Sequence, residues 1–581
     1  TKRSLRYGEL VDAAAGMPIP DNVRLKKPKD FTIIGKPIGR LDSRAKTMGT
    51  AVFGMDVKVE GMLTAAVVHP PTLGGRLKSF DSSRAKSMTG IRHIVSISSG
   101  VAVVADKFWQ ARKAVESLKI EWDKGPLADL SSKKISARWK GMAGEPGEEI
   151  RHDGNVDAAF KNAAKVLEAV YELPYQAHAC PEPMNCTAHV REDGCDVWVP
   201  TQNQGGVHEI AAALAGLDLD RVRVHTTFLG GGFGRRGDVD FVIEAVEISK
   251  AIKKPVKVVW TREQDVRNDH FRPAAYQTVR GAVDLKGDLM AFDHSIVCPS
   301  YLDSMIDTLA PAIMPRWLPR PLKNAAASVA APIVKRSRSG KAAAGGASDI
   351  PYSINNFRVR FIKDDPGVPI GAWRSVAYSR NAFVVESFMD ELAVLAGKDP
   401  VQFRYGLLGK SPRHRKVLEI AASKAGWGTR LPTGIYRGVA LHDFHDTAVA
   451  MVAEVSVDDK GSVRVPRIVC AVDCGTVINP KNVEVQMASG VAFGLTATLK
   501  GAITIKDGHA EQSNFDDFPL LTIAEMPEVE VHIVPSTAPP TGIGEVGVPP
   551  VAPAVANAVF AATGKRIRKL PITGKDLVGR T

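Results

Sequence analysis

The chain has 581 residues, of which 44% are hydrophobic and 24% are charged, so it is expected to fold as several domains with ordinary globular cores. Its formal net charge of +13 is spread along the chain without an aromatic and basic recognition module, which argues against nucleic-acid binding and favours an acidic docking partner. No stretch approaches the roughly 20 uninterrupted apolar residues that cross a bilayer, so no membrane-spanning helix is expected.

The six cysteines form no CxxC pair and no ferredoxin-like run; they are Cys180, Cys186, Cys195, Cys298, Cys470 and Cys474. An iron–sulfur cluster or a structural zinc held by this chain alone is therefore not expected. Any such cluster would belong to another subunit.

The first part of the chain predicts an N-terminal extension at 1–30 and then a compact α+β module at 31–126. In that module strands are expected at Leu63–Val68 and Val101–Val104, and a helix at Phe108–Leu118. Chain breakers at Asp123 to Pro126 end the module. The polar, lysine-rich stretch that follows, to about residue 150, is predicted to be a linker.

Beyond this linker strands and helices are mixed rather than strictly alternating. Residues 310–350 are rich in Pro, Ala, Ser, Gly and Lys, which predicts a mobile surface loop rather than a core element. Gly397 is a plausible cap for the helix before it. The expected elements are a helix from Val156, strands at Ala188–Val190, Asp196–Val199 and Val222–Val224, a helix at Ala382–Ala396, strands at Val449–Ser456 and Ile468–Val472, and a helix at Ala552–Thr563.

A glycine-rich segment, Leu229–Arg236, follows a predicted strand. Glycines let backbone amides approach a ligand that a Cβ would keep away, which is typical of an anion or cofactor loop. An ordinary tight turn is an equally good interpretation of this segment alone. It is neither a Walker loop nor a dinucleotide fingerprint, because GK[ST] and the GxGxxG spacing with a later acid are missing.

Two polar side chains stand where strands end and helices begin. Gln202 could present its amide to an oxo group, although Thr201 could simply cap the next helix. Arg374 could hold a phosphate or a pterin oxygen, although a surface salt bridge would explain it equally well.

The segment Gly542–Pro550 places one acid, Glu545, among glycines and prolines directly before an apolar helix. The glycines, including Gly544, leave room for a bulky ligand, and the prolines stiffen the backbone. No cation neighbours Glu545 in the sequence, which suits a general base. A capping or solvated glutamate is the alternative.

Together and in this order, these segments resemble the molybdenum hydroxylases of the xanthine oxidase family, in particular the branch of the isoquinoline 1-oxidoreductase β-subunit and the membrane-bound aldehyde dehydrogenase large subunit. Further matches flank them at Ile34–Pro37, Arg40–Asp42 and Ala552–Ala558. The resemblance implies a multidomain α+β fold. It would comprise a small a/b hammerhead-type domain at 31–126, a first molybdopterin-binding domain at 150–425 and a second, with the catalytic glutamate, at 426–581.

The resemblance also implies a site. Glu545 would be the catalytic base, Gln202 would hydrogen-bond the apical oxo ligand of molybdenum, and Arg374 would hold the pterin. Phe233 and Gly234 would line the metal's face, while no side chain would ligate the metal. The implied cofactor-binding residues are Gln202, Gly231, Gly232, Phe233, Gly234, Arg235, Arg374 and Gly544.

The implied enzyme oxidises an aldehyde or an N-heteroaromatic substrate of the isoquinoline or nicotinate type, with water as the oxygen source. Its cofactor would be molybdopterin cytosine dinucleotide. Electrons would leave through [2Fe–2S] clusters on a small partner subunit, and a cytochrome c subunit could receive them. Twin-arginine leaders in this branch favour the periplasmic side of the inner membrane over the cytoplasm.

The sequence departs from the family in three places. Gly237 follows Arg236 where purine-oxidising members have an acid, and an arginine that orients purines is replaced within Asp269–Arg272. Xanthine is therefore not the expected substrate. The pterin-binding GQG segment is absent, so another chain carrying it is an expected partner, and a non-catalytic scaffold or maturation protein with the same fold is the alternative function.

Overall fold

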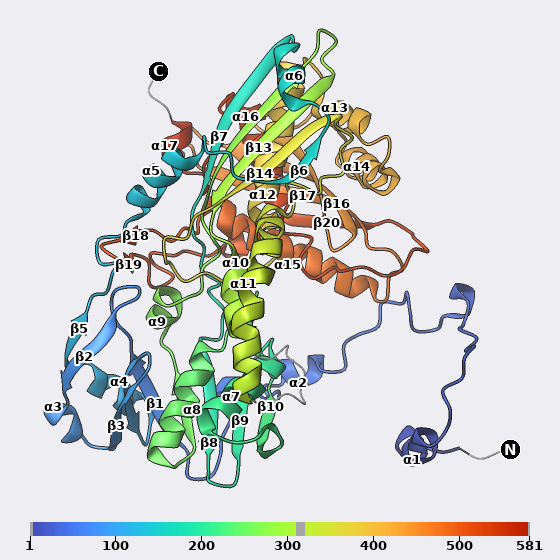
Figure 1. Cartoon of the computed structure of the whole chain (residues 1–581). Coiled ribbons are helices and arrows are strands. Elements are labelled where there is room, and N and C mark those ends of the chain that lie inside the picture. The colour runs from blue at the N-terminus through green and yellow to red at the C-terminus, as the bar shows by residue number, and fades with distance from the viewer. Residues whose placement is uncertain (1–3, 310–319, 579–581) are drawn as a thin grey trace.

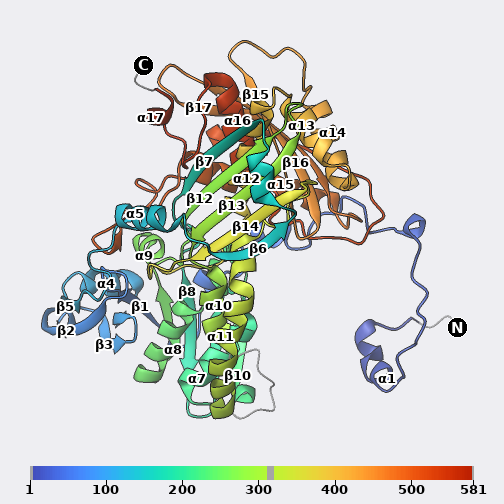
Figure 2. The same ribbon diagram turned by 45° about the horizontal axis from the view of Figure 1, so that its top comes forward.

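The computed structural model describes residues 4–309 and 320–578. The first part is an arm that extends away from the body (Figures 1 and 2) and carries the short η1 (Tyr7–Leu10) and α1 (Val11–Ala15). No described side chain before Ala51 is buried. The end of the arm is tied down where Gly35 N donates to Ile478 O at 2.9 Å and Asn479 Nδ2 donates to Ile38 O at 2.8 Å.

A seven-stranded sheet forms the lower part of the molecule in Figure 1. Its order is β10-β9-β8-β11-β1-β4-β3, and β1 pairs in parallel with β11 with Leu63 opposite Val256. The main strands of the predicted 31–126 module therefore share one sheet with strands from residues 185 to 259. The elements of this region are β1 (Leu63–Val68), β3 (Ile91–Ile97), β4 (Gly100–Ala105), α4 (Phe108–Val115), β8 (Asn185–Val190), β9 (Cys195–Val199), α7 (Gln204–Ala215), β10 (Val222–Thr226), α8 (Asp240–Ile252) and β11 (Val256–Val259).

Two further sheets form the upper part. One has the order β6-β14-β13-β12-β7 and the other β15-β16-β17-β20. Helices α12 and α16 contact strands of these sheets and each other, so their apolar residues join one large core. The elements are β6 (Glu148–Asp153), β7 (Lys165–Leu173), β12 (Ala275–Val283), β13 (Leu289–Cys298), β14 (Asn356–Lys363), α12 (Tyr378–Leu395), β15 (Tyr436–Phe444), β16 (Thr447–Val457), β17 (Val463–Asp473), α15 (Pro480–Leu499), β20 (Glu528–Ile533) and α16 (Val551–Thr563).

Smaller elements complete the fold. They include two two-stranded sheets, β2 with β5 and β18 with β19. Their bounds are α2 (Ser43–Thr47), β2 (Arg76–Asp81), α3 (Ser83–Lys86), β5 (Lys119–Asp123), α6 (Val156–Lys161), α9 (Arg262–Arg267), α10 (Tyr301–Leu309), α13 (Pro400–Leu407), α14 (Pro412–Lys424), β18 (Ile505–Lys506), β19 (His509–Ala510) and α17 (Gly574–Leu577).

The predicted linker up to residue 150 is wrong. It contains α5 (Ser132–Met142), which Ser131 caps by accepting from Lys134 N, and the start of β6. Ile135 and Trp139 lie one helical turn apart and are both buried, and Trp139 Nε1 donates to Asp364 Oδ2 at 2.7 Å. The lysines that suggested a linker occupy the other faces of an amphipathic helix.

The loop predicted for 310–350 is also wrong for its described part, because α11 spans Arg320–Ala344. Residues 310–319 lie outside the described residues. Alanine is the strongest helix former, and the helix continues through Pro332 although an internal proline removes one backbone hydrogen bond. Its last residues, Ala343 and Ala344, are fully buried, so this segment also contributes to the core.

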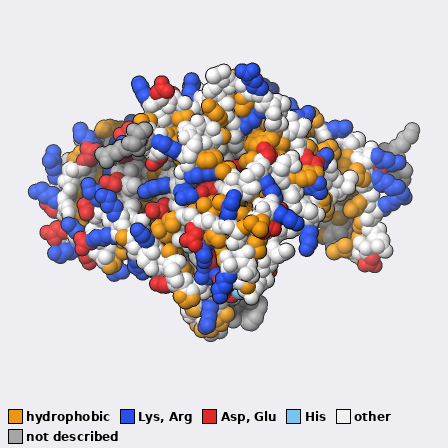
Figure 3. All heavy atoms as spheres, turned by 90° about the horizontal axis from the view of Figure 1, so that it is seen from above, with side chains coloured by type: hydrophobic (Ala, Val, Ile, Leu, Met, Phe, Trp, Pro, Cys, Tyr) orange, Lys and Arg blue, Asp and Glu red, His pale blue; other side chains and the backbone are white. Residues whose placement is uncertain are grey.

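Within the described ranges no helix is long and apolar enough to cross a membrane. On the face shown in Figure 3, lysine and arginine side chains are spread among acidic and apolar ones. The distribution matches the even spread of charge along the sequence.

Candidate active site

The glycine loop, defined as Gly230–Gly234, follows β10 and packs tightly against two other segments. A Cβ on Gly232 would lie 2.4 Å from Gln202 Oε1, and one on Gly234 would lie 1.4 Å from the carbonyl oxygen of Ala372. Gly231, Phe233 and Gly234 adopt positive φ values of 90°, 53° and 110°. An ordinary tight turn does not require such contacts, so the glycines serve a close junction of chain segments.

Gln202 hydrogen-bonds the end of the glycine loop and the residues that follow it. Its Oε1 accepts a hydrogen bond from Gly234 N at 3.1 Å, and its backbone N donates to Arg236 O at 2.9 Å. Its amide nitrogen has no hydrogen-bond partner within the described part of the chain, and the residue is exposed. The cap of α7 is Asn203, which accepts from Gly206 N, and not Thr201. Gln202 therefore holds the loop with one end of its amide and offers a donor with the other.

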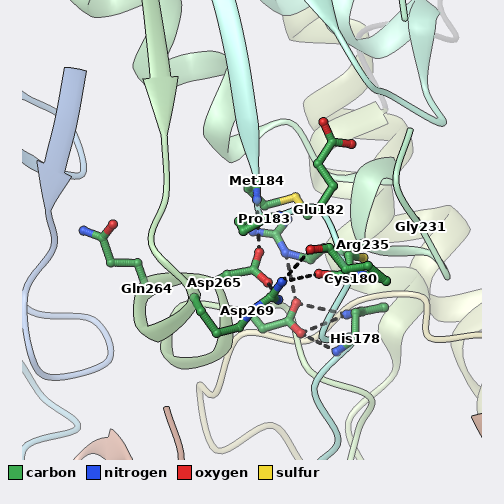
Figure 4. A network of polar contacts seen from close by, with 12 residues as sticks. His178, Cys180, Glu182, Pro183, Met184, Gly231, Arg235, Gln264, Asp265 and Asp269 are labelled. Carbon is green, nitrogen blue, oxygen red and sulfur yellow. Dashed lines mark hydrogen bonds and ion pairs between the residues drawn. The ribbon is translucent and has the colours of Figure 1, made fainter. Parts of the chain in front are cut away.

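A buried ionic network lies behind the glycine loop (Figure 4). Arg235 is 1% exposed, and its guanidinium contacts Asp240 at 2.6 Å and Asp269 at 2.9 Å. Asp269 also accepts from His178 Nδ1 at 2.9 Å and from the His178 backbone. Burial opposes ionisation of Asp269, but His178 and Arg235 outweigh it and lower its pKa. The Arg235 side chain thus anchors the loop through its ion pairs with Asp240 and Asp269.

The neighbouring Arg236 extends this support, and the buried Asp265 lies within electrostatic range of both arginines. Arg236 donates to Gly231 O at 2.7 Å and to Glu182 O at 2.7 Å, and Glu182 in turn accepts from Gly230 N. Burial raises the pKa of Asp265 to about 6. Neither His178 nor Glu182 stands in a recognisable motif, so the sequence did not point to their roles.

The turn at Gly371–Val376 meets the glycine loop. The Ala372 carbonyl lies 3.1 Å from His178 Nε2, and the Trp373 ring stacks on Phe493, which stacks on Phe233. Ser375 and Val376 have φ values of 68° and 42°. Such left-handed conformations are strained for residues other than glycine and persist where surrounding contacts impose them, often at functional sites.

Arg374 joins this turn to the C-terminal region. Its guanidinium is nearly buried and donates to Gly544 O at 2.9 Å, to Ser489 Oγ at 2.9 Å and to Gln486 Oε1 at 3.0 Å. Burial lowers the pKa of Arg374, and the nearby Glu545 opposes that change. Arg374 therefore positions the loop that carries Glu545.

Glu545 lies between these segments. Its Oε1 accepts from Ser375 N at 3.2 Å, and 38% of its side chain is exposed. Two groups that can carry a positive charge lie near Glu545 in space: His445 Nε2 is 3.7 Å from Glu545 Oε2, and Arg374 is close enough to interact. His445 belongs to the turn between β15 and β16, and no sequence pattern connects that turn with the segment around Glu545.

A cavity of about 200 Å³ adjoins the site. Its wall includes the three stacked aromatic rings of Phe233, Phe493 and Trp373, together with His178 and Phe518. Apolar walls with few polar groups are typical of pockets that bind small organic molecules.

The residues fit an organic cofactor that brings its own metal rather than a metal held by side chains. No group of three or more His, Cys, Asp or Glu side chains suited to a metal ion occurs in the described ranges, and all six cysteines are buried free thiols. A backbone lined with glycine, an unpaired amide at Gln202 and a partly exposed carboxylate at Glu545 converge instead. The donor set suits a large ligand with many oxygen and nitrogen atoms.

Two segments match family profiles described as molybdopterin cofactor-binding domains, at residues 143–316 and 426–527. The first contains Gln202 and the glycine loop, whereas the second ends before Glu545. These matches agree with the expected multidomain fold of mixed helices and strands, with two molybdopterin-binding parts.

Relatives match nearly the whole chain. It is 30% identical to the beta chain of isoquinoline 1-oxidoreductase from Brevundimonas diminuta, covering 97% of this chain and 71% of that protein. It is 31% identical to a membrane-bound aldehyde dehydrogenase [pyrroloquinoline-quinone] of Gluconacetobacter polyoxogenes, covering 99% and 77%. A nicotinate dehydrogenase chain of Pseudomonas putida is 30% identical, with 49% of its length covered.

Solved structures share the fold at low identity. The aldehyde oxidoreductase of Desulfovibrio gigas aligns with a TM-score of 0.77 at 16% identity, covering 95% of this chain and 81% of that one. Quinoline 2-oxidoreductase of Pseudomonas putida 86 aligns with a TM-score of 0.75 at 14% identity, covering 94% and 98%. On these matches the chain belongs to the xanthine oxidase family of molybdenum hydroxylases, as a molybdopterin-binding large subunit.

Proposed function

We propose that this chain is the catalytic subunit of a molybdenum-dependent oxidoreductase that oxidises an aldehyde or an N-heteroaromatic compound, with Glu545 as the base. The names of its relatives, an isoquinoline oxidoreductase, an aldehyde dehydrogenase and a nicotinate dehydrogenase, support these substrate classes. The observation that carries the assignment of Glu545 is its hydrogen bond from Ser375 N, a donor that a strained backbone turn presents beside the glycine loop.

The proposed cofactor is molybdopterin cytosine dinucleotide. Gln202 would donate its free amide hydrogens to it, the backbone of Gly231 to Gly234 would line one side, and Gly544 would leave room on the other. Arg374 and Arg235 would act as positioning residues for these segments. When bound, the cofactor supplies the redox centre that accepts two electrons from the substrate.

The protein's own contribution is proton transfer and orientation. Ser375 N–H holds Glu545 Oε1, so Oε2 is left to accept the proton from the water-derived oxygen that adds to the substrate carbon. His445, 3.7 Å from Oε2, is placed to pass a proton onward to solvent. The stacked rings of Phe233, Phe493 and Trp373 supply a flat apolar wall for an aromatic substrate.

A non-catalytic scaffold or maturation protein is the alternative. It would have no need for a carboxylate held beside the glycine loop by a strained turn, so the arrangement favours an enzyme. Metal analysis of the purified assembly separates the two, because a scaffold would purify without molybdenum.

The test of the base is Glu545→Gln, which keeps the shape of the side chain and removes the basic oxygen. The variant should keep its molybdenum and lose several orders of magnitude in turnover. Glu192→Gln, at an exposed carboxylate, is the matched control. A Glu545→Gln enzyme with more than about a tenth of the wild-type rate would exclude Glu545 as the base.

We also propose that the chain works with partners. A small subunit with [2Fe–2S] clusters would take the electrons, a second chain would supply the GQG pterin-binding segment, and a cytochrome c subunit would follow on the periplasmic side of the inner membrane. Support comes from the buried, unclustered cysteines of this chain. Co-purification with mass spectrometry and iron determination tests this; normal activity with a one-electron acceptor from this chain alone would contradict it.

The proposed division is an extension at 1–30, a hammerhead-type domain at 31–126 and molybdopterin-binding domains at 150–425 and 426–581. The shared seven-stranded sheet means that the second unit would complete the core of the first. Limited proteolysis followed by sequencing of the fragments tests these boundaries.

A further inference from the structure

A cavity of about 470 Å³ lies beside α5, the helix on the left of the body in Figure 1. Its floor belongs to one hydrophobic core cluster, because Ile135, Trp139, Tyr175 and Ile503 line it and are each at most 3% exposed. Cavities of this size with largely apolar walls are typical of sites for small organic molecules. We call it the α5 cavity; it is bounded by residues between 132 and 140 of α5, by 172–175, 274–276 and 503–504, and by Lys569.

The α5 cavity is separate from the cavity beside the active site. The chain passes from one to the other between Tyr175 and Gln176, and the two cavities share no lining residue. Gln176 is 1% exposed, exchanges backbone hydrogen bonds with Arg272 and donates its side-chain amide to Gly501 O. A ligand in the α5 cavity would therefore occupy a site of its own.

The cations of α5 differ in whether they have partners. Lys134 donates to a backbone carbonyl oxygen at 2.7 Å, Arg138 forms an ion pair with a carboxylate, and neither lines the cavity. Lys133 and Lys140 do line it, and their side chains make no hydrogen bond or ion pair in the described ranges. They are two helical turns apart, about 10 Å along the axis. The unpaired charges of this helix are thus the two that border the cavity.

The opposite wall adds a third cation. Lys569, in the segment after α16, is exposed and has no side-chain partner in the part of the chain that the structure describes. The Tyr276 hydroxyl also makes no hydrogen bond there. Glu172 is the one carboxylate among the described lining residues, and its Oε2 accepts from Ser136 Oγ at 3.1 Å. Three cations against one acid leave the opening of the cavity positively charged.

We propose that the α5 cavity binds a small organic carboxylate with an apolar body. The apolar body packs against Trp139 and Ile503, and the carboxylate meets the three lysines at the opening. An uncharged apolar molecule would leave those charges unpaired, and an inorganic anion would leave the apolar floor in contact with water. A carboxylate with an apolar body matches both parts of the cavity.

The first experiment measures binding to the purified full-length chain by titration calorimetry. The probes are 2-naphthoate, 2-naphthamide and acetate, and 2-naphthoate should bind at least about tenfold more tightly than the other two. The triple variant Lys133→Gln/Lys140→Gln/Lys569→Gln should raise the Kd of 2-naphthoate about tenfold, because three exposed charge contacts of ordinary strength are removed together. Lys134→Gln, on the same helix but outside the cavity, is the matched control and should leave the Kd unchanged.

Two further variants test the cavity without removing a lysine. Ala137 lines the cavity and is exposed, so Ala137→Trp should fill the space and abolish binding of 2-naphthoate. Glu172→Gln keeps an oxygen that can accept from Ser136 and removes the one negative charge, so it should strengthen binding about threefold. Structural damage would weaken binding in both variants, whereas the proposal expects effects of opposite sign.

Three outcomes would overturn the proposal. Equal affinity for 2-naphthoate and 2-naphthamide would show that the lysines do not recognise the ligand. An unchanged Kd in both the triple lysine variant and Ala137→Trp would place the ligand elsewhere, for example in the cavity beside the active site. Binding to the isolated chain that is lost in the purified assembly would assign the α5 cavity to the interface with a partner subunit.

Discussion

Gly234→Ala tests whether the glycine loop and the turn at Ala372 must touch. At φ 110° an alanine Cβ would stand 1.4 Å from the Ala372 carbonyl oxygen. An ordinary carbon–oxygen contact is about 3.4 Å, so one of the two backbone segments must retreat by about 2 Å. The atom that the Cβ would meet belongs to the backbone, so no flexible side chain can move aside to relieve the clash.

The cost has two parts. Placing a residue with a side chain in this region of φ lowers the stability of the folded state by about 1–3 kcal/mol. Moving the Ala372 carbonyl away from His178 Nε2, which lies 3.1 Å from it, leaves buried polar atoms unpaired and lowers the stability by about another 1–3 kcal/mol. Together they predict about 2–6 kcal/mol of destabilisation. The displacement also moves Ser375 N, which holds Glu545, and a misplacement of about 1 Å can cost about a hundredfold in rate.

The assay combines thermal unfolding with turnover of the purified assembly. Gly237→Ala is the matched control, because a Cβ there meets no atom within 4 Å and its φ is not left-handed. It should behave like the wild type. A Gly234→Ala enzyme with the wild-type melting temperature and rate would refute the direct contact between the two segments.

Three further predictions concern the same site. Arg235→Met should destabilise the protein by about 3–5 kcal/mol because Asp240 and Asp269 lose their buried cation. The control Arg92→Met, at an exposed ion pair with Asp106, should change the melting curve little. Equal effects of the two substitutions would contradict the anchoring role of Arg235. His270 Nδ1 lies 3.0 Å from Asp238, which outweighs the effect of burial and raises the pKa of His270 above 6.5. The stability that the ion pair of His270 adds is complete below the unfolded-state pKa and is lost as the pH rises through the folded-state pKa. The difference in melting temperature between the wild type and His270→Gln should therefore shrink from pH 6 to pH 9. A constant difference would contradict this role. Gln202→Ala should retain molybdenum and lose less activity than Glu545→Gln, since a hydrogen bond tunes the centre without transferring a proton; full metal and full rate would remove Gln202 from the site.

Local pattern predicted many elements of this fold. The strand at Leu63–Val68 has the expected bounds, and the predicted helix at Ala382–Ala396 corresponds to α12, which begins four residues earlier. The predictions for two long segments were wrong because their amino-acid composition resembled that of a linker or loop. In α5 the lysines obscured two buried residues at helical spacing, and in α11 Pro332 and the small residues suggested a loop although alanine favours a helix.

The sequence predicted only those parts of the site in which the characteristic residues lie close together in one segment. The glycine loop and the segment around Glu545 stand out because few structures require such compositions. His445 and His178 contribute through contacts between segments far apart in the chain. No spacing rule links residue 178 to residue 372, and no single-sequence pattern tells a buried arginine with a carboxylate partner from one without. The pairing of β1 with β11 was not predicted either, because the two strands are far apart in the sequence.

The contacts of Arg374 explain how the base can be held firmly and still be free to react. An arginine that gripped the Glu545 carboxylate directly would occupy both of its oxygens through a bidentate pair. Arg374 instead binds the carbonyl of the preceding residue, Gly544, and the side chains of Ser489 and Gln486 on α15. The carboxylate itself receives one backbone N–H, from Ser375. The position of Glu545 is thereby fixed through the peptide, while one carboxylate oxygen stays available for a proton.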